Sequence, residues 1–332
     1  MTMLDLPDAA AVQAAAIRIT GHVVNTPLVR SDFIDAQCGA RVFFKCENLQ
    51  AIGAFKARGA ANAVLSLSLE AAARGVVTHS SGNHAAALAR AARRAGIPAT
   101  IVMPTNAPAT KRALVLREGG KIVDCEPNLA AREAGAAAVV AATGATLVHP
   151  YDDSAVIAGQ GTAVLEVYAT GLRPKLLLVP VGGGGLLTGS GLATRSASPG
   201  TRVIGVEPAG ADDAARSFRS GIRQPQTDPR TIADGLRTAL GERPFALLSQ
   251  VVDDIVTVSE DAIRQAMDLL FNELKLVVEP SGAVPLAALL EGCVVADDEE
   301  VLVVLSGGNV DLNPCPWCPA KDKIHAQQNH AK

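Results

Sequence analysis

The chain has 332 residues, of which 48% are hydrophobic and 19% are charged. That balance supports a large buried core and excludes an intrinsically disordered chain. The net charge of −3 argues against binding to nucleic acids or to anionic membrane surfaces, because both need a basic surface.

The first residues, M-T-M-L-D-L-P-D, carry neither the basic nor the apolar region of a secretory signal. No apolar run is long enough to span a bilayer. The six cysteines are scattered, which fits a reducing compartment better than a disulfide framework. We therefore expect a cytoplasmic protein with no membrane span.

In chain order, we expect an alanine-rich helix over Ala9 to Thr20, a strand over Arg41 to Lys45 and a helix that begins near Ala54. Short apolar runs then alternate with helical stretches. The expected strands are Gly75 to Thr78, Ala99 to Met103, Lys121 to Asp124, Thr146 to His149, Leu176 to Val181, Arg202 to Val206, Ile255 to Val258 and Val301 to Leu305. The expected helices are Asn83 to Ala95, Ala107 to Glu118, Ala130 to Ala142, Gly161 to Ala169, Leu186 to Ser196, Glu260 to Lys275 and Gly282 to Leu290. This alternation predicts βαβ units and a parallel sheet with helices on both faces.

Lys56 lies in the first turn of the helix that begins near Ala54. A helix N-terminus carries partial positive charge, which disfavours a cation and should lower the pKa of this ammonium group. A neutral amine is the form that makes a Schiff base with an aldehyde cofactor. A lysine on a solvated helix face is the simpler alternative, and the other motifs decide between the two.

The segment Ser80-Ser81-Gly82-Asn83-His84 follows one predicted strand and opens the next helix. Ligands of open α/β sheets collect at the carboxyl ends of strands, and free amides at a helix N-terminus bind carboxylates. The segment therefore predicts a site for an anionic ligand. An ordinary serine N-cap is the alternative.

The loop V-G-G-G-G-L-L lies between a strand and a helix and contains four consecutive glycines, Gly182, Gly183, Gly184 and Gly185. Without side chains, successive backbone N–H groups can surround a phosphate. Glu207 ends the next strand, as the ribose-binding acid of a dinucleotide site would. The dinucleotide spacing G-x-G-x-x-G nevertheless fails, because Leu187 or Thr188 stands where its last glycine is needed. We therefore expect a cradle for a single phosphate group.

Glu207, Ala211 and Asp213 fall within one short stretch. Two carboxylates and a free carbonyl suit a hard divalent cation whose shell is completed by water. The alternative is an acidic surface loop in which an aspartate caps the next helix.

A C-x-x-C pair, Cys315 to Cys318, follows the last predicted strand. Such a pair can be redox-active, or can form half of a zinc site with His325 and His330. The spacing is short for a zinc finger and no βαβ unit surrounds it. We therefore interpret residues 315–332 as a dispensable tail.

Five blocks in this order resemble the serine/threonine dehydratase and serine racemase family, the pyridoxal-phosphate enzymes of fold type II. They are the lysine segment F-F-K-C-E-N-L-Q-A-I-G-A-F-K, S-S-G-N-H, V-G-G-G-G, G-V-E-P with A-D-D, and L-S-G-G-N-V-D-L. The resemblance implies two open, twisted, mostly parallel sheets flanked by helices, as in the tryptophan synthase β-like fold. It further implies a large domain (1–49 and 146–314), a small inserted domain (50–145) and a homodimer.

The same resemblance gives each motif a role toward pyridoxal 5′-phosphate. Lys56 carries the cofactor and then acts as a base, and residues 182–185 hold its phosphate. Asn83 contacts the phenolic oxygen of the cofactor, and Ser306 contacts its pyridine nitrogen. Glu207, the Ala211 carbonyl and Asp213, rather than its neighbour Asp212, hold Mg²⁺ or Ca²⁺.

The substrate-binding residues are also implied by the resemblance. The substrate carboxylate is bound by the serine loop, that is by Ser80, Ser81, Gly82 and His84. Ser81 faces the cofactor ring opposite Lys56, where a second acid/base would allow racemisation. Arg132 is placed to pair with a second substrate carboxylate.

The implied activity is the dehydration of small β-hydroxy amino acids to 2-oxo acids and ammonia. L-Threonine and L-serine are the leading substrates. Serine racemase and threo-3-hydroxyaspartate dehydratase are the alternatives within the family, and Arg132 would favour the second. The alternatives from other classes are an NAD-dependent oxidoreductase and a non-catalytic pyridoxal-phosphate carrier.

Overall fold

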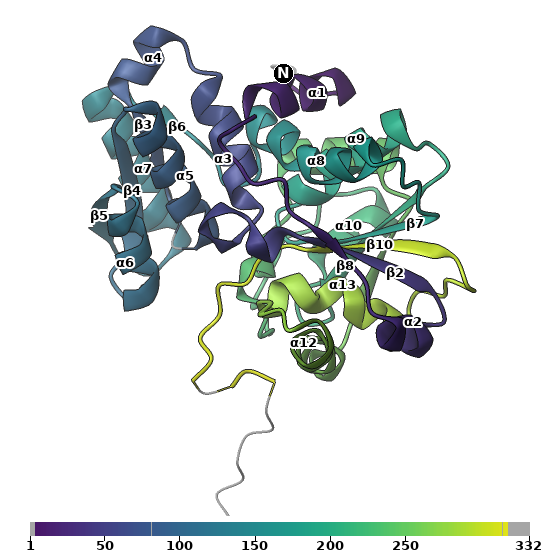
Figure 1. Ribbon diagram of the computed structural model, residues 1–332. Coiled ribbons are helices and arrows are strands. Elements are labelled where there is room, and N and C mark those ends of the chain that lie inside the picture. Colours follow the sequence, from purple (N-terminus) through teal and green to yellow (C-terminus); the bar gives the residue numbers. More distant parts are fainter. Residues whose placement is uncertain (1–3, 81, 314, 318–332) are drawn as a thin grey trace, which may run out of the picture.

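The computed structural model describes residues 4–80, 82–313 and 315–317. Within these residues the strands form two sheets, which lie side by side in separate units of the molecule (Figure 1). The larger sheet has six strands in the order β1-β2-β10-β7-β8-β9, and the smaller has four in the order β5-β4-β3-β6. All pairs are parallel except β1 with β2. The predicted fold class is confirmed.

The strands are short, and those at the centre of the larger sheet are buried on both faces, as the continuous apolar runs predicted. The larger sheet contains β1 (Leu28–Val29), β2 (Arg41–Cys46), β7 (Leu176–Pro180), β8 (Arg202–Pro208), β9 (Asp254–Val258) and β10 (Glu300–Leu305). The smaller sheet contains β3 (Val76–Thr78), β4 (Ala99–Pro104), β5 (Lys121–Cys125) and β6 (Thr146–Leu147).

Helices cover both faces of the larger sheet, each through its own cluster of buried apolar side chains. One face packs against α2 (Asp32–Cys38), α12 (Glu260–Leu274) and α13 (Pro280–Leu290). The other packs against α1 (Ala9–Arg18), α8 (Ser154–Ala169), α9 (Gly185–Ala197), α10 (Asp213–Ser220) and α11 (Glu242–Val251). None of the helices in the described residues combines the length and apolar character needed to cross a bilayer.

The smaller sheet is covered in the same way. One face packs against α3 (Lys56–Leu65), α5 (Asn83–Ala95) and α6 (Ala109–Arg117), and the other against α7 (Leu129–Thr143). Helix α4 (Leu69–Arg74) contributes no buried residue. Single 3-10 turns lie at Glu47–Leu49, Ala51–Gly53 and Asp234–Leu236.

Helix α8 begins at Ser154, seven residues before the Gly161 start that the sequence indicated. Asp153 caps it through a bond from the Val156 amide. Gly159 and Gly161 lie inside the helix, at positions where neighbouring backbones touch it. A Cβ on Gly159 would lie 2.6 Å from the Gly59 Cα, and one on Gly161 would lie 2.3 Å from the Gly189 carbonyl oxygen. Helix α8 is thus closely packed between α3 and α9.

Helix α3 contacts both α8 of the larger unit and α5 of the smaller one, and it lies between the two units in Figure 1. Strand β6, which pairs with β3, follows residue 145, where the sequence analysis placed the end of the small domain. The domain boundaries themselves stay a prediction.

The described part of the C-terminal tail is packed against α12. The ring of Trp317 lies 5.1 Å from that of Phe271, and Arg264 donates to the Pro316 carbonyl at 3.3 Å. Cys318, His325 and His330 lie outside the described residues, so the C-x-x-C hypothesis stays untested.

Candidate active site

A pocket of about 240 Å³ lies where the carboxyl ends of β3, β7 and β10 face each other across the two units. These are the strand ends at which ligands of α/β sheets are expected. The sequence-predicted residues that line it are Lys56, Ser80, Gly82, Asn83, His84, Arg132, Gly182, Gly183, Gly184, Gly185 and Ser306. Ser81 lies outside the described residues. The fold thus brings most of the predicted cofactor and substrate residues into one cavity.

Lys56 is the first residue of α3, and its Nζ donates a hydrogen bond to the Pro150 carbonyl at 2.7 Å. Removal from bulk water lowers the pKa of its ammonium group to about 8, against a smaller opposing effect of the Glu279 carboxylate. The direction is the one predicted from the helix N-terminus, but burial is its first cause. A fraction of this amine is therefore neutral near physiological pH.

The glycine loop joins β7 to α9, and Gly184 has a φ of +87°, which favours glycine. A Cβ on Gly183 would lie 2.2 Å from the Tyr151 ring, so a side chain there would collide with the pocket wall. Among the described residues, none of the amides of Gly182 to Gly185 donates a hydrogen bond to the protein. Four unpaired amides at a helix N-terminus fit a phosphate group.

The serine loop leads from β3 into α5. The Gly82 amide donates to Ser80 Oγ at 3.4 Å. His84 is buried, and its Nε2 lies 3.2 Å from the Val148 carbonyl, whereas its Nδ1 has no partner among the described residues. Burial and the nearby Lys56 charge hold the His84 pKa well below its usual value, so the imidazole is neutral. A neutral ring with one open nitrogen can accept a hydrogen bond from a ligand.

Ser306 follows β10 and is buried at the floor of the pocket. Its carbonyl accepts the Phe55 amide at 3.0 Å, and Ala54 forms an isolated antiparallel bridge with Gly307. The end of β10 is thereby tied to the lysine segment, which fixes where α3 begins.

Arg132 reaches the pocket from α7. No hydrogen bond or ion pair to its guanidinium is found within the described residues. In that part of the chain, the cavity therefore offers an unpaired guanidinium in addition to the Lys56 amine.

The pocket also contains residues that the sequence motifs did not identify, among them Glu279, Tyr151 and His79. Glu279 precedes Pro280 at the start of α13 and is buried. It is the one charged residue between Leu276 and Leu290, a signal that the sequence offered. Burial raises its pKa to about 7. Tyr151 and His79 flank the His149 ring at 4.6 and 5.4 Å.

Glu207, Ala211 and Asp213 lie outside this pocket, at the end of β8 and the start of α10. Glu207 accepts the Ala214 and Ala215 amides at 3.2 and 2.8 Å, and Asp213 accepts the Leu240 amide at 2.8 Å. Burial and the neighbouring carboxylates raise the pKa of both acids. Two buried like charges with a nearby carbonyl fit a divalent cation, although no cluster of three acidic, histidine or cysteine side chains occurs in the described residues.

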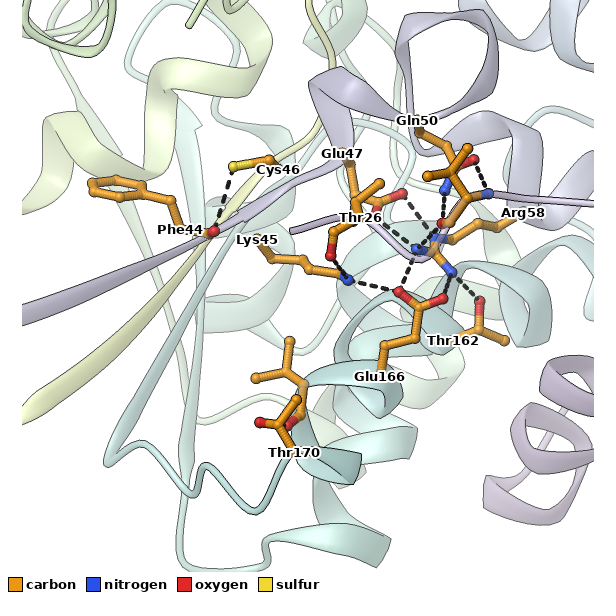
Figure 2. A network of polar contacts seen from close by, with 12 residues as sticks. Thr26, Phe44, Lys45, Cys46, Glu47, Gln50, Arg58, Thr162, Glu166 and Thr170 are labelled. Atoms are coloured by element: carbon orange, nitrogen blue, oxygen red, sulfur yellow. Dashed lines mark hydrogen bonds and ion pairs between the residues drawn. The ribbon is translucent and has the colours of Figure 1, made fainter. Parts of the chain in front are cut away.

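Behind the pocket, Arg58 of the same helix α3 is held in a buried ionic network (Figure 2). Its guanidinium donates to both carboxylate oxygens of Glu47 at 2.7 and 2.8 Å and to both of Glu166 at 2.7 and 2.8 Å. Lys45 donates to Glu166 at 2.6 Å, and Thr26 donates to Glu47 at 2.5 Å. Two cations and two carboxylates thus balance within the network.

Comparison with known proteins agrees with this site. Residues 19–307 match the family model described as pyridoxal-phosphate dependent enzyme. The chain is 46% identical to a beta-hydroxyaspartate dehydratase of Paracoccus denitrificans, over 92% of this chain and 96% of that protein. It is 47% identical to a serine racemase of Arabidopsis thaliana, over 92% and 94%.

Among solved structures, a threonine deaminase from T.th. superposes with a TM-score of 0.87 at 46% identity, covering 92% of this chain and 99% of that one. These relatives are all fold-type-II enzymes, and their activities differ. The sequence match agrees with the two-sheet fold, the pocket lysine and the free amides of the glycine loop in the described residues. The chain belongs to the pyridoxal-phosphate dependent enzymes of fold type II.

Proposed function

We propose that the protein is an ammonia-lyase that dehydrates small β-hydroxy amino acids, with 3-hydroxyaspartate as its preferred substrate. The single observation that carries this preference is the Arg132 guanidinium in the pocket, which has no hydrogen-bond or ion-pair partner within the described residues. A guanidinium pairs bidentately with a carboxylate, and 3-hydroxyaspartate has a second carboxylate where serine and threonine have none. L-Serine and L-threonine, the substrates that the sequence favoured, are then the slower ones.

The cofactor, when bound, withdraws electrons from the substrate Cα and so makes its proton acidic. Lys56 holds the cofactor and takes that proton, and its pKa of about 8 keeps part of the amine neutral for this purpose. The amides of residues 182–185 bind the cofactor phosphate, Asn83 its phenolic oxygen and Ser306 its pyridine nitrogen. Ser80, Ser81, Gly82 and the backbone amide of His84 in the first turn of α5 bind the α-carboxylate.

The preference is tested by the release of oxaloacetate, pyruvate and 2-oxobutanoate from 3-hydroxyaspartate, serine and threonine, each as separate stereoisomers. We expect the highest kcat/KM for one isomer of 3-hydroxyaspartate. The variant Arg132→Met keeps bulk but not charge, and it should lose roughly 10- to 100-fold in kcat/KM for 3-hydroxyaspartate alone, the value of a charge-assisted pair. Equal losses on all three substrates would contradict the assignment.

Arg117→Met is the matched control, because Arg117 is exposed and absent from this pocket. Its kinetic constants should equal those of the wild type. A purified protein that lacks the visible absorption band of pyridoxal phosphate and releases no 2-oxo acid would contradict the proposed function as a whole.

Serine racemisation is a second candidate, favoured by the identity to the plant serine racemase. Racemisation needs an acid/base on each face of the substrate, and Ser81 is our candidate opposite Lys56. Ser81→Ala should lose racemisation about a hundred-fold while it keeps most dehydration of L-serine. Chiral analysis of serine alongside pyruvate release decides this, and equal loss of both reactions would reject the role.

The candidate metal site consists of Glu207, Asp213 and the carbonyl of Ala211. These residues would hold Mg²⁺ or Ca²⁺, which would neutralise two carboxylates whose pKa values are raised first by burial. The cation would stabilise the start of α10 and would take no part in the reaction.

A further inference from the structure

Three polar side chains are joined by hydrogen bonds, and two of them, Asn83 and Glu279, line the pocket. Asn309 follows β10, Asn83 is the first residue of α5, and Glu279 immediately precedes α13. Asn309 Nδ2 donates to Asn83 Oδ1 at 2.9 Å. Asn83 Nδ2 in turn donates to both carboxylate oxygens of Glu279, at 3.0 and 3.1 Å. These hydrogen bonds link the smaller unit to two segments of the larger one.

The orientation of the Asn83 amide is fixed from both ends. An ionised Glu279 only accepts hydrogen bonds, so it faces the amide nitrogen. The Nδ2 group of Asn309 only donates, so it faces the amide oxygen, and its second hydrogen is used by the Ile52 carbonyl at 2.7 Å. Rotation of the Asn83 amide by half a turn would set donor against donor and acceptor against acceptor.

Two glycines leave space for these three hydrogen-bonded side chains. A Cβ on Gly307 would lie 2.5 Å from Glu279 Oε1, and one on Gly53 would lie 2.7 Å from Asn309 Oδ1. Gly53 has a φ of +73°, so its conformation also favours glycine. Glu279 is only 5% exposed, so its carboxylate is largely shielded from water.

We propose that Glu279 and Asn309 are positioning residues that fix the Asn83 amide with an N–H directed at the oxygen of a ligand in the pocket. This rests on the proposed function, in which that oxygen is the phenolic oxygen of the cofactor. An amide nitrogen has two hydrogens, so one can serve Glu279 while the other serves the ligand. Without Glu279 and Asn309, the amide can turn its carbonyl toward the ligand oxygen and repel it.

The test compares the wild type with Glu279→Gln, Asn309→Ala, Asn83→Ala and the double variant Asn83→Ala/Glu279→Gln. Glu279→Gln keeps the shape but offers both a donor and an acceptor, so the Asn83 orientation is no longer imposed. The readouts are the wavelength of the visible band of bound pyridoxal phosphate and the Kd of the apoprotein for pyridoxal phosphate. We expect a displaced band and roughly fivefold weaker binding in Glu279→Gln and in Asn309→Ala, the effect of one misdirected hydrogen bond.

The double variant separates positioning from direct contact. If Glu279 acts through Asn83, the double variant has the band and the Kd of Asn83→Ala alone. Additive changes would mean that Glu279 acts on the ligand itself and would overturn the proposal. Unchanged band and Kd in folded Glu279→Gln and Asn309→Ala would also overturn it.

Glu118→Gln is the matched control, because Glu118 is buried and paired with Arg93 at 2.8 Å but does not line the pocket. It should behave as the wild type in both readouts. A failure of the proposed function is distinguishable, since the wild type would then bind no pyridoxal phosphate or release no 2-oxo acid.

Discussion

Helix α3 presents two basic side chains, two residues apart, to opposite environments. Behind the helix, Arg58 is fully buried, and carboxylates, a hydroxyl and a backbone carbonyl accept from its guanidinium (Figure 2). In front of it, Lys56 donates to one carbonyl, and the described part of the pocket around it contains unpaired groups: the Arg132 guanidinium, His84 Nδ1 and the amides of residues 182–185. The Arg58 network is satisfied by protein groups, whereas the pocket around Lys56 contains groups that a ligand can bind.

A structural charge cluster and a binding site differ in whether their buried polar groups find partners within the protein. Buried polar groups without partners cost free energy, so a native fold keeps them where a ligand supplies the partners. A saturated network of charges instead tolerates no removal, because each deletion leaves an uncompensated charge in the interior. The two regions should therefore respond in opposite ways to mutation.

Removal of Lys56 should have the largest effect on turnover. Lys56→Ala loses both the attachment of the cofactor and the base, so we expect 2-oxo acid release to fall on the order of a thousand-fold or more. Its Tm should stay within a few degrees of the wild type. Lys175→Ala, at an exposed lysine, should change neither quantity. Wild-type-like turnover in Lys56→Ala would reject the mechanism.

Removal of Arg58 should have the opposite signature. Arg58→Met leaves Glu47 and Glu166 without their main partner, and we expect a loss of about 3–5 kcal/mol in the free energy of unfolding. Denaturant titration of the apoprotein measures this, with the exposed Arg117→Met as control. An Arg58→Met protein of wild-type stability with impaired turnover would contradict the structural role of Arg58.

The pH dependence of stability should report Glu279. Its pKa is raised from 4.5 to about 7 by burial, with Asp234 raising it further and Asn83 and Lys111 opposing. The folded protein therefore keeps a proton that the unfolded chain releases, so this contribution to stability is full below pH 4.5 and is lost as pH rises through 7. The loss amounts to about 3 kcal/mol. Denaturant titrations of apoprotein across this pH range should show a shallower decline in Glu279→Gln, and identical slopes would contradict the raised pKa.

Chelation should have the smallest effect of the four. If Glu207 and Asp213 bind a cation in the native state only, its removal lowers stability by about 2–3 kcal/mol at roughly a hundredfold excess of metal over Kd. We expect a strong chelator to lower Tm and Mg²⁺ or Ca²⁺ to restore it. No metal by elemental analysis, together with an unchanged Tm, would remove the metal proposal and leave the lyase proposal intact.

Much of the pocket around Lys56 could be predicted from the sequence, because its residues lie in local motifs at strand ends. The glycine loop, the serine loop, Lys56 and Ser306 each carry such a signal. Tyr151 and the Arg58 network carry none, and the lone charge of Glu279 does not identify its partners, which lie far away in sequence. Arg58 meets Glu166 across 108 residues, and Asn83 meets Glu279 across 196. Pairings of that range depend on the order of strands in the sheet, which apolar runs do not specify.

Helices α10 and α11 were not among the predicted helices, although both are amphipathic. Both pack onto the larger sheet through buried apolar side chains. The direction of the Lys56 pKa was correctly predicted, but its first cause was not, because burial depends on the closed pocket rather than on local sequence.

The position of β10 has a consequence for synthesis on the ribosome. This strand lies between β2 and β7, and it pairs with all of β2, from Arg41 to Cys46, although the two strands stand near opposite ends of the chain. Until residue 305 has left the exit tunnel, β2 and β7 each present an unpaired edge, and the bridge from Gly307 to Ala54 cannot form. The nascent chain should therefore depend on chaperones for most of its translation, while the smaller sheet, complete by Leu147, can fold early.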